Sequence, residues 1–378
     1  MRKRCWHLLR RIVNRREALI GLNLIGSIGT ARLKRLLEIF VCPQEILASS
    51  ADALTRVSGI GHAIASKITS LKEEGIAAEI KLAKERGLSI LTYEDEGYPL
   101  NLKNIFDPPI VLYVKGQIRD DDSRSIAVVG SRRASCYGLT SAERLSGELA
   151  RLGITVISGM ARGIDTFAHK GALKAGGRTL AVMGSGFAHL YPAENKKLAE
   201  EISHAGAVIS EFPLTALPLK QNFPRRNRLI SGLAKGVVVV EAARNSGALI
   251  TADFALEQGR EVFALPGAID SSLSYGTNEL IKQGSRLVTS VNDIIEELFG
   301  SLLGEQFAPR PLRQCAQEKQ MLSKEESFLY NLISDTPLEM DEIIEKSHMD
   351  IATAAGVLLR LEIKNLVQQL PGKQFVRG

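Results

Sequence analysis

Short apolar runs recur along the middle of the chain, and amphipathic segments of helical length separate them. Each run is apolar at nearly every position, which is typical of strands buried on both faces of a parallel sheet. Helical crossovers between such strands build an α/β core. The pattern therefore predicts an extended, Rossmann-like, doubly wound and mostly parallel sheet with strands at 126–130, 155–159, 179–184, 207–212, 236–242, 261–267 and 286–290.

The first 90 residues have helical periodicity and contain a repeated pattern. Residues 24–40 and 56–71 both read apolar-x-small-Ile-Gly before a predicted helix, which resembles the helix-hairpin-helix motif. We expect an all-α, helix-hairpin-helix or SAM-like domain over 1–90. In the second copy, Gly59 allows close backbone approach, and the free N–H groups of the helix that follows suit a phosphate. Ser27 replaces that glycine in the first copy, so nonspecific DNA contact and structural packing both stay open.

The rest of the chain divides by composition. Residues 91–300 are assigned to the Rossmann-like domain, and 91–123 form a Pro-containing connector with a short strand at 110–116. A polar linker follows at 301–322. Three predicted helices and a hairpin around Pro371-Gly372 then predict a winged-helix domain over 323–378. Its third helix is poor in basic residues where a DNA-reading helix carries them, which favours protein contact or packing.

Composition narrows the functional classes. The 378 residues include 48 Lys and Arg against 42 Asp and Glu, and this mild basic excess fits a polyanionic partner. The four cysteines form no C-x-x-C pair, which argues against a zinc ribbon and favours a reducing compartment.

No apolar run is long enough to span a bilayer, so we expect no membrane association. The basic N-terminus lacks the apolar core of a secretion signal, and a cytoplasmic location is predicted. An organellar transit peptide remains a minor alternative.

Ligands of open parallel sheets bind beyond the carboxyl ends of the strands, where this chain has turns of small residues. Each turn leads into a predicted helix, so backbone N–H groups can face an anion. Arg133 and Arg244 add charge at the same edge. The candidate nucleic-acid-binding residues in these turns are Gly130, Ser131, Arg132, Ser158, Gly159, Arg162, Gly184, Gly186, Ser246 and Gly247.

No reactive group accompanies these turns. The dinucleotide fingerprint, the P-loop, the nucleophile elbow and the zinc-protease motif are all absent from the sequence. The six histidines have no ligand spacing, and His169 and His189 are expected to be satisfied or exposed rather than catalytic. We therefore predict no catalytic residue, no metal and no cofactor.

The stretch "NFPRRNRLISGL" at 222–233 is interpreted as a crowded positive loop that extends this edge. Its part "RNRLISGL" also starts a helix, so some of the run, such as Asn227, is expected to be structural. Arginines hold phosphates without reading sequence, and a base stacked on an aromatic ring gains roughly 1–3 kcal/mol. The alternative is that Phe223 is core and the arginines pair with Glu241, Asp253 or Glu257. The candidate residues added here are Lys220, Asn222, Phe223, Arg225, Arg226, Asn227 and Arg228.

The motifs together resemble those of the bacterial DprA/Smf family of DNA-processing proteins. The resemblance covers essentially the whole chain and is strongest over 98–298. It rests on "AVVGSRRAS", "VISGMARGIDTFAHKGAL", "AVMGSGFAHLYPAENKKL", "SEFPL", "NFPRRNRLISGL", "VVVVEAARNSGALITADFALEQGREVFALPG" and "GTNELIKQGSRLV". It implies non-catalytic, sequence-nonspecific binding of single-stranded DNA, protection of incoming DNA, RecA loading during natural transformation or recombination, and homodimers built on the Rossmann-like core.

By motif position, the resemblance also suggests roles for single residues. Arg132 matches a DNA-contact arginine of the family, and Lys220 and Phe223 match a lysine and a stacking aromatic at the DNA site. The family's "RNR" falls on 226–228 and its "SG" turn on 246–247. The loop "EAARNSG" departs from many members, which puts the role of Arg244 in doubt.

Two other functions stay open on the sequence. One is a nucleotide-processing enzyme of the lysine-decarboxylase-like (LOG) Rossmann group, for which Glu241 and Glu257 remain although the glycine-rich motif is lost. The other is a duplex-binding regulator that acts through the winged helix. The first predicts hydrolysis that depends on Glu241, and the second predicts sequence-specific binding that survives loss of the arginines.

Overall fold

The computed structural model describes residues 13–300, 323–334, 337–364, 366–370 and 374–377. The chain forms two compact units, Met1–Leu312 and Arg313–Gly378, which are described separately. The predicted basic start and the linker at 301–322 lie outside the described residues. We propose that the first unit divides further near residue 90, between a helical part and a sheet part.

The first unit is built on a nine-stranded sheet in the order β1-β2-β6-β5-β4-β3-β7-β8-β9. From β6 to β9 all neighbouring strands are parallel, and β1 and β2 are antiparallel additions at one edge. The predicted α/β class and all seven predicted strands are confirmed. They are β3 (Ser125–Val129), β4 (Thr155–Ser158), β5 (Thr179–Val182), β6 (Ala207–Ser210), β7 (Gly236–Val239), β8 (Glu261–Ala264) and β9 (Arg286–Leu287).

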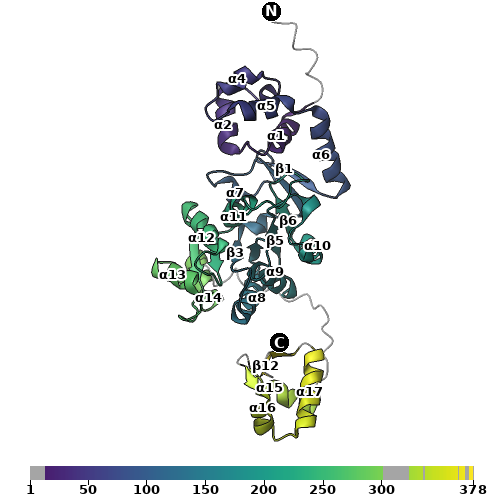
Figure 1. The fold of residues 1–378 in the computed structure, drawn as a ribbon, viewed down its shortest axis with the longest axis vertical. Helices are drawn as coiled ribbons and strands as arrows, with labels where there is room; N and C mark the ends of the chain where they lie inside the picture. The colour runs from purple at the N-terminus through teal and green to yellow at the C-terminus, as the bar shows by residue number, and fades with distance from the viewer. Residues whose placement is uncertain (1–12, 301–322, 335–336, 365, 371–373, 378) are drawn as a thin grey trace, which may run out of the picture. The chain divides into compact units, whose positions relative to one another are not determined.

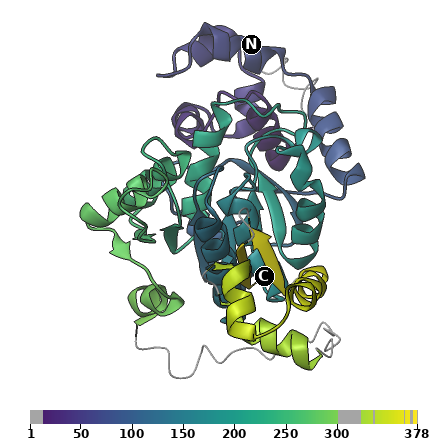
Figure 2. The same ribbon diagram turned by 60° about the horizontal axis from the view of Figure 1, so that its bottom comes forward.

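Helices cover both faces of this sheet, as apolar strands require. The five strands from β3 to β7 are buried at every residue, because side chains on either face meet a helix. One face packs against α7 (Leu100–Lys103), α11 (Asn222–Leu233), α12 (Gly247–Glu257) and α13 (Tyr275–Lys282). The other packs against α8 (Cys136–Arg151), α9 (Ile164–Lys174), α10 (Lys196–Ala205) and α14 (Val291–Phe299). Figure 2 shows α12 and α13 in green at one end of the sheet.

The predicted connector is part of the sheet. The expected strand near 110–116 is confirmed as β2 (Val111–Gly116), and β1 (Ser89–Thr92) pairs with it in antiparallel register. β2 in turn pairs with β6, so these strands extend the sheet at its edge. The sequence pattern did not predict this edge, because an added strand that also packs against helices carries no crossover signal.

Between residue 13, where the description starts, and β1, six helices precede and cover the β1–β2 edge. Each repeated segment forms a helix, a turn and a second helix, and the turns end at Gly29 and Gly61. Their apolar side chains share one core with β1, β2 and Leu214. Figure 1 shows these helices, in purple to blue, next to β1. The helices are α1 (Arg15–Leu24), α2 (Thr30–Ile39), α3 (Pro43–Leu47), α4 (Ala51–Thr55), α5 (His62–Ser70) and α6 (Glu73–Glu85).

The second unit has the predicted winged-helix elements. Its helices are α15 (Lys324–Leu332), α16 (Met340–Ser347) and α17 (Ile351–Ile363). The wing contains β11 (Val367–Leu370) and β12 (Gln374–Arg377), and a third strand, β10 (Leu338–Glu339), pairs with β12. The expected turn at Pro371-Gly372 lies outside the described residues. Asp350 caps the N-terminus of α17, and its carboxylate accepts from the N–H groups of Ala352 and Thr353, so an acid occupies that helix start.

Candidate nucleic-acid interface

The sheet topology brings the predicted strand-end turns to one edge. Strand order reverses between β3 and β7, and such a switch point is where open α/β sheets bind ligands. Gly130 to Arg132 follow β3, Gly159 and Arg162 follow β4, Gly184 and Gly186 follow β5, and Ser246 begins α12 after β7. Ser158, Gly159, Gly184 and Gly186 are buried, whereas Arg132, Arg162 and Gly247 are exposed. The edge therefore combines buried backbone turns with outward-facing charge.

One glycine sets how closely the first two turns approach. Gly163 has φ of 72°, and a Cβ placed there would lie 2.4 Å from the carbonyl oxygen of Ser131. The next residue, Ile164, donates its N–H to that same oxygen at 3.2 Å. Only glycine tolerates both the left-handed backbone and the close contact. The turn that carries Arg132 is therefore held against the start of α9.

The arginine-rich stretch is helical throughout, so the helix expected from Arg226 begins earlier, and the loop that we predicted from its charge is not formed. α11 spans Asn222–Leu233, and its residues from Arg226 onward are buried. Leu229, Ile230 and Leu233 belong to the core beneath the sheet face. The expectation of a loop assumed that neighbouring arginines would repel one another. In the folded protein every arginine of α11 donates to acceptors, and Arg225 and Arg228 share one carboxylate, so the repulsion is offset.

Arg226 is buried beneath the turns, with 3% of its surface exposed. Its Nη1 donates to the carbonyl oxygens of Gly159 and Val182, and its Nε donates to Oδ1 of Asn227 at 3.2 Å. Burial lowers the pKa of Arg226 to about 10, and the nearby Asp165 carboxylate opposes this shift. The guanidinium stays charged at neutral pH. It therefore joins α11 to the ends of β4 and β5.

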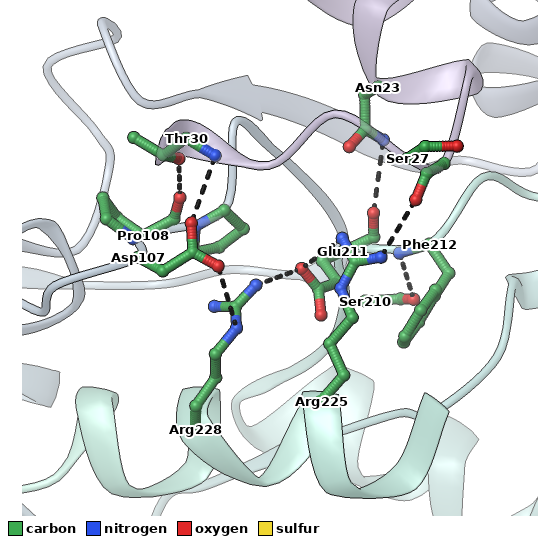
Figure 3. A network of polar contacts seen from close by, with 12 residues as sticks. Asn23, Ser27, Thr30, Asp107, Pro108, Ser210, Glu211, Phe212, Arg225 and Arg228 are labelled. Carbon is green, nitrogen blue, oxygen red and sulfur yellow. Dashed lines mark hydrogen bonds and ion pairs between the residues drawn. The ribbon is translucent and has the colours of Figure 1, made fainter. Parts of the chain in front are cut away.

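Arg225 and Arg228 share the carboxylate of Glu211 (Figure 3). Oε2 of Glu211 lies 3.2 Å from Nη2 of Arg225 and 2.5 Å from Nη2 of Arg228. Arg228 Nε also lies 3.7 Å from Oδ2 of Asp107. The arginine partners that we considered from sequence, Glu241, Asp253 and Glu257, were therefore wrong. Glu211 follows directly after β6, so only the assembled sheet places it beneath α11.

The same network reaches the first hairpin of the helical part (Figure 3). Arg225 Nη1 donates to the carbonyl oxygen of Gly26 at 3.3 Å. Asp107 Oδ1 accepts from the N–H of Thr30 at 3.1 Å, so a carboxylate already occupies the start of α2. A phosphate at that helix start would have to displace this acid. The first hairpin is therefore bound to the core. This favours structural packing over DNA contact for the first copy of the repeat.

The second hairpin presents its turn outward. Ser58, Gly59 and Gly61 are exposed, and Gly59 has φ of 84°. Two arginines of the first hairpin hold the turn from behind: Arg32 Nε donates to the oxygen of Gly59 at 3.2 Å, and Arg35 Nη1 donates to that of Ser58 at 3.4 Å. The two copies thus have different surroundings although their sequences are similar.

Phe223 lies at the outer end of α11, half-buried above the turn after β5. A Cβ at Gly184 would lie 2.8 Å from its ring, so the glycine makes room for it. The guanidinium carbon of Arg132 lies 5.1 Å from the ring centroid of Phe223, within cation–π range. The ring of Tyr191 lies 5.7 Å away at 59°. We define this group, Arg132, Tyr191 and Phe223, as the aromatic cluster; Lys220, just before α11, is exposed.

Tyr191 was not among the predicted site residues. It belongs to the turn "GSGFAHLYP", which the sequence places at a strand end, and its side chain is 41% exposed. An aromatic residue in such a turn was an available signal. Its proximity to Phe223 was not, because the two residues come from different crossovers.

Two further arginines of this edge have local partners. Arg162 forms an ion pair with Glu194, and this hydrogen bond raises the pKa of Arg162 and lowers that of Glu194. Both side chains are largely exposed, so the pair contributes little to stability.

Arg244 lies over the ring of Tyr275, 5.1 Å from its centroid. Asn222 begins α11 and donates its side-chain amide to the oxygen of Leu217 at 3.0 Å, which closes the loop before the helix.

Glu241 and His169 have structural partners near this edge, and His189 is exposed. Glu241 is buried and accepts from the N–H and hydroxyl of Ser135 at 2.8 and 2.6 Å, at the start of α8. Glu257 ends α12, roughly 15 Å along the helix from the sheet edge where α12 begins. His169 is fully buried with Nδ1 2.6 Å from the hydroxyl of Thr179, and burial lowers its pKa to about 3. Over the described ranges, no cluster of His, Cys, Asp and Glu is placed to hold a metal ion.

Comparison with known proteins adds the family. Residues 89–299 match the family of DNA recombination-mediator protein A, and residues 314–373 match the DprA winged helix domain. The chain belongs to the DprA/Smf family. Protein Smf of Escherichia coli is 39% identical over 326 residues, which cover 86% of this chain and 87% of that protein.

Two solved DprA structures resemble the fold. DprA from Streptococcus pneumoniae has a TM-score of 0.65 at 34% identity, covering 76% of this chain and 99% of its own. DNA processing protein A from Helicobacter pylori, described for its single-stranded DNA binding mode, has a TM-score of 0.51 at 30% identity, covering 56% and 95%. The DprA/Smf assignment thus spans both the sheet and the winged helix. No helix in the described part of the chain has the length and apolarity to cross a bilayer.

Proposed function

We propose that this DprA/Smf protein binds single-stranded DNA without sequence preference at the carboxyl edge of its sheet. The observation that carries the proposal is the aromatic cluster: an exposed arginine and two accessible rings above a glycine turn. Rings stack on any base, and guanidinium groups bind phosphates whatever the sequence. The family name and the DNA-binding relative from Helicobacter pylori support the same reading.

We assign two roles to the candidate residues. Those that face outward, Arg132, Lys220, Phe223 and the added Tyr191, contact the strand, and the exposed Gly247 offers its backbone N–H at the start of α12 to a phosphate. The N–H groups of Ser131 and Ser246 donate to the carbonyl oxygens of Glu241 and Ala243, so the turns at 130–131 and 246–247 otherwise shape the edge. The buried residues position those contacts from below. They are Ser158, Gly159, Gly184, Gly186, Arg226, Asn227 and Arg228, with Arg225 at the junction to the first hairpin.

We also propose that the protein is not an enzyme. Glu241 is engaged at the start of α8, and Glu257 lies at the far end of α12, so the two acids do not form a catalytic pair. His169 is buried and Asp350 caps the N-terminus of α17, so neither residue offers a reactive group. A nucleotide-hydrolysis assay checks this directly, and turnover lost in Glu241→Gln would contradict it.

The wider biological role follows from family membership alone. We propose that the protein acts in the cytoplasm as a homodimer built on the sheet domain, protects single-stranded DNA and loads RecA during natural transformation or recombination. RecA-catalysed strand exchange on DNA coated with single-strand-binding protein tests the loading step. Sedimentation at several concentrations tests the dimer, and a monomer throughout would contradict it.

The DNA proposal is tested with fluorescent oligo-dT and a matched duplex across a salt series. We expect preference for the single strand and affinity that falls steeply with salt, because bound phosphates release counterions. Phe223→Ala removes a stacking ring worth roughly 1–3 kcal/mol. Arg132→Ala lowers the salt dependence by about one ion pair.

Arg151→Ala is the matched control, since this exposed arginine ends α8 at the opposite edge of the sheet. Thermal unfolding of each variant verifies its fold. The DNA proposal is wrong if Arg132→Ala and Phe223→Ala, both folded, bind oligo-dT as the unchanged protein does.

A further inference from the structure

A cavity of about 600 Å³ lies on the flank of the first unit, beside the β1–β2 edge. Its walls come from the α6–β1 turn, β2, β6, α10 and the short helices η2 (Phe187–His189) and η3 (Ala193–Asn195) with the residues near them. Figure 1 shows α6 and α10 on the same side of the sheet. A cavity of this volume accommodates a ligand of drug or nucleotide size.

The lining combines an apolar wall with cations. Leu88, Phe187, Leu190 and Val208 supply apolar surface, and Phe187 offers a half-buried ring. The charged groups of the lining are Arg86, Lys115, Lys196 and Glu200, together with His189.

Within the described residues, some of the charged side chains in the cavity form ion pairs and others do not. Lys115 and Glu200 neutralise each other at 2.6 Å. Arg86 and Lys196 are exposed, and neither has an ion pair with any residue in the part of the chain that the structure describes. The cavity therefore keeps two available cations beside an apolar wall, which suits a ligand with both a flat apolar group and a negative charge.

The cavity is continuous with the aromatic cluster along the chain. The segment that follows the glycine turn of β5 supplies Phe187, His189 and Leu190 to the cavity wall. Two residues after His189, Tyr191 lies against Phe223. The same short segment thus borders the proposed DNA site on one side and the cavity on the other. Residues 184–191 therefore connect the aromatic cluster to the cavity wall.

We propose that this cavity is a second contact site for the same DNA strand, in which a base lies against the apolar wall and phosphates meet Lys196 and Arg86. The inference rests on the proposed function. An acidic peptide would also match two cations beside apolar side chains. The nucleotide is favoured because the segment that borders the aromatic cluster also forms part of the cavity wall.

The test uses the full chain and two lengths of oligo-dT, about 4 and about 16 nucleotides, the span of site sizes seen in small single-strand-binding folds. Lys196→Glu is expected to weaken binding of the longer strand about tenfold and to lower its salt dependence by about one ion pair, while the short strand binds as before. Lys197→Glu is the matched control: it is the next residue of α10, is 91% exposed and is not part of the cavity lining. Arg86→Glu tests the second cation in the same assay, and the same selective weakening of the longer strand is expected.

Each outcome decides between the alternatives. Equal losses in Lys196→Glu and Lys197→Glu would show a general charge effect and overturn the site. If Arg132→Ala weakens both lengths while Lys196→Glu weakens neither, the DNA-binding function stands and the cavity proposal fails. If the unchanged protein binds neither length, both proposals fail. An oligo-glutamate probe that binds in a Lys196-dependent manner, while the long strand does not need Lys196, would assign the cavity to an acidic protein partner.

Discussion

The arginines of α11 and those of the turn after β3 lie at the same edge of the sheet, in opposite surroundings. Arg226 and Arg228 are buried and donate to carbonyl oxygens or to Glu211. Arg132 and Arg133 are exposed. A buried guanidinium must be surrounded by acceptors, and those acceptors hold it in place. An exposed one is hydrated and can exchange water for a phosphate oxygen. A high local density of arginine therefore does not identify the residues that touch a ligand.

The largest expected effect in this comparison is the loss of Arg226. Arg226→Met removes the donor to Gly159 and Val182 and leaves the buried Asp165 without its neighbouring cation. Breaking such a buried arrangement costs about 3–5 kcal/mol of the free energy of unfolding. Urea unfolding measures this loss. An unchanged midpoint in Arg226→Met would mean that Arg226 is not structural.

The next effect separates buried from exposed ion pairs. Glu211→Gln leaves Arg225 and Arg228 without their shared carboxylate, and we expect a loss of about 2–3 kcal/mol, since both groups of the Arg228 pair are buried. Glu194→Gln removes the exposed partner of Arg162 and serves as the control, with no measurable change. Similar unfolding midpoints for the two variants would contradict the claim that the buried ion pairs of Glu211 stabilise the fold more than the exposed pair of Glu194.

His169 tests the same buried region through pH. Its pKa is about 3 in the folded chain and about 6.5 when unfolded, so the unfolded state binds the proton first as pH falls. Stability from this group is complete above pH 6.5 and is lost on acidification, by about 2 kcal/mol between pH 7 and pH 5. Urea unfolding over this range, compared with His169→Gln, isolates the contribution. The variant should show a shallower pH dependence, and equal slopes would contradict the assignment.

The smallest effect on stability belongs to the outer arginine. Arg132→Ala should change the free energy of unfolding by no more than about 0.5 kcal/mol, because its side chain is exposed and its contact is the accessible face of Phe223. Its binding to oligo-dT should fall nonetheless. A variant that loses stability as Arg226→Met does would place Arg132 with the buried set.

The sequence predicted the sheet well because burial on both faces leaves a direct pattern of apolar runs. It also predicted the strand-end turns and the position of Phe223, since a parallel sheet brings the ends of its strands to one edge. It missed the β1–β2 extension of the sheet and the third strand of the wing. It also took the first part of α11 for a loop, because the partners of Arg225 and Arg228 come from residues 107 and 211, which are distant in sequence.

The two hairpins also show that similar sequences do not reveal which other parts of the fold they will contact. Their sequence repeats are alike, and both form a helix, a turn and a helix. The first turn is held by Arg225 and Asp107, while the second faces outward. Nothing within either repeat encodes this difference, since both partners of the first turn lie outside the helical part.

The sequence by itself determined the class of fold, the strands of the parallel sheet and the edge at which a ligand would bind. Local periodicity and small-residue turns carry that information because they depend on neighbours along the chain. The tertiary structure alone decided which arginines face inward, placed Tyr191 beside Phe223, and formed the cavity next to them. These features arise where separate crossovers meet, and only the folded chain brings a buried charge to its acceptors.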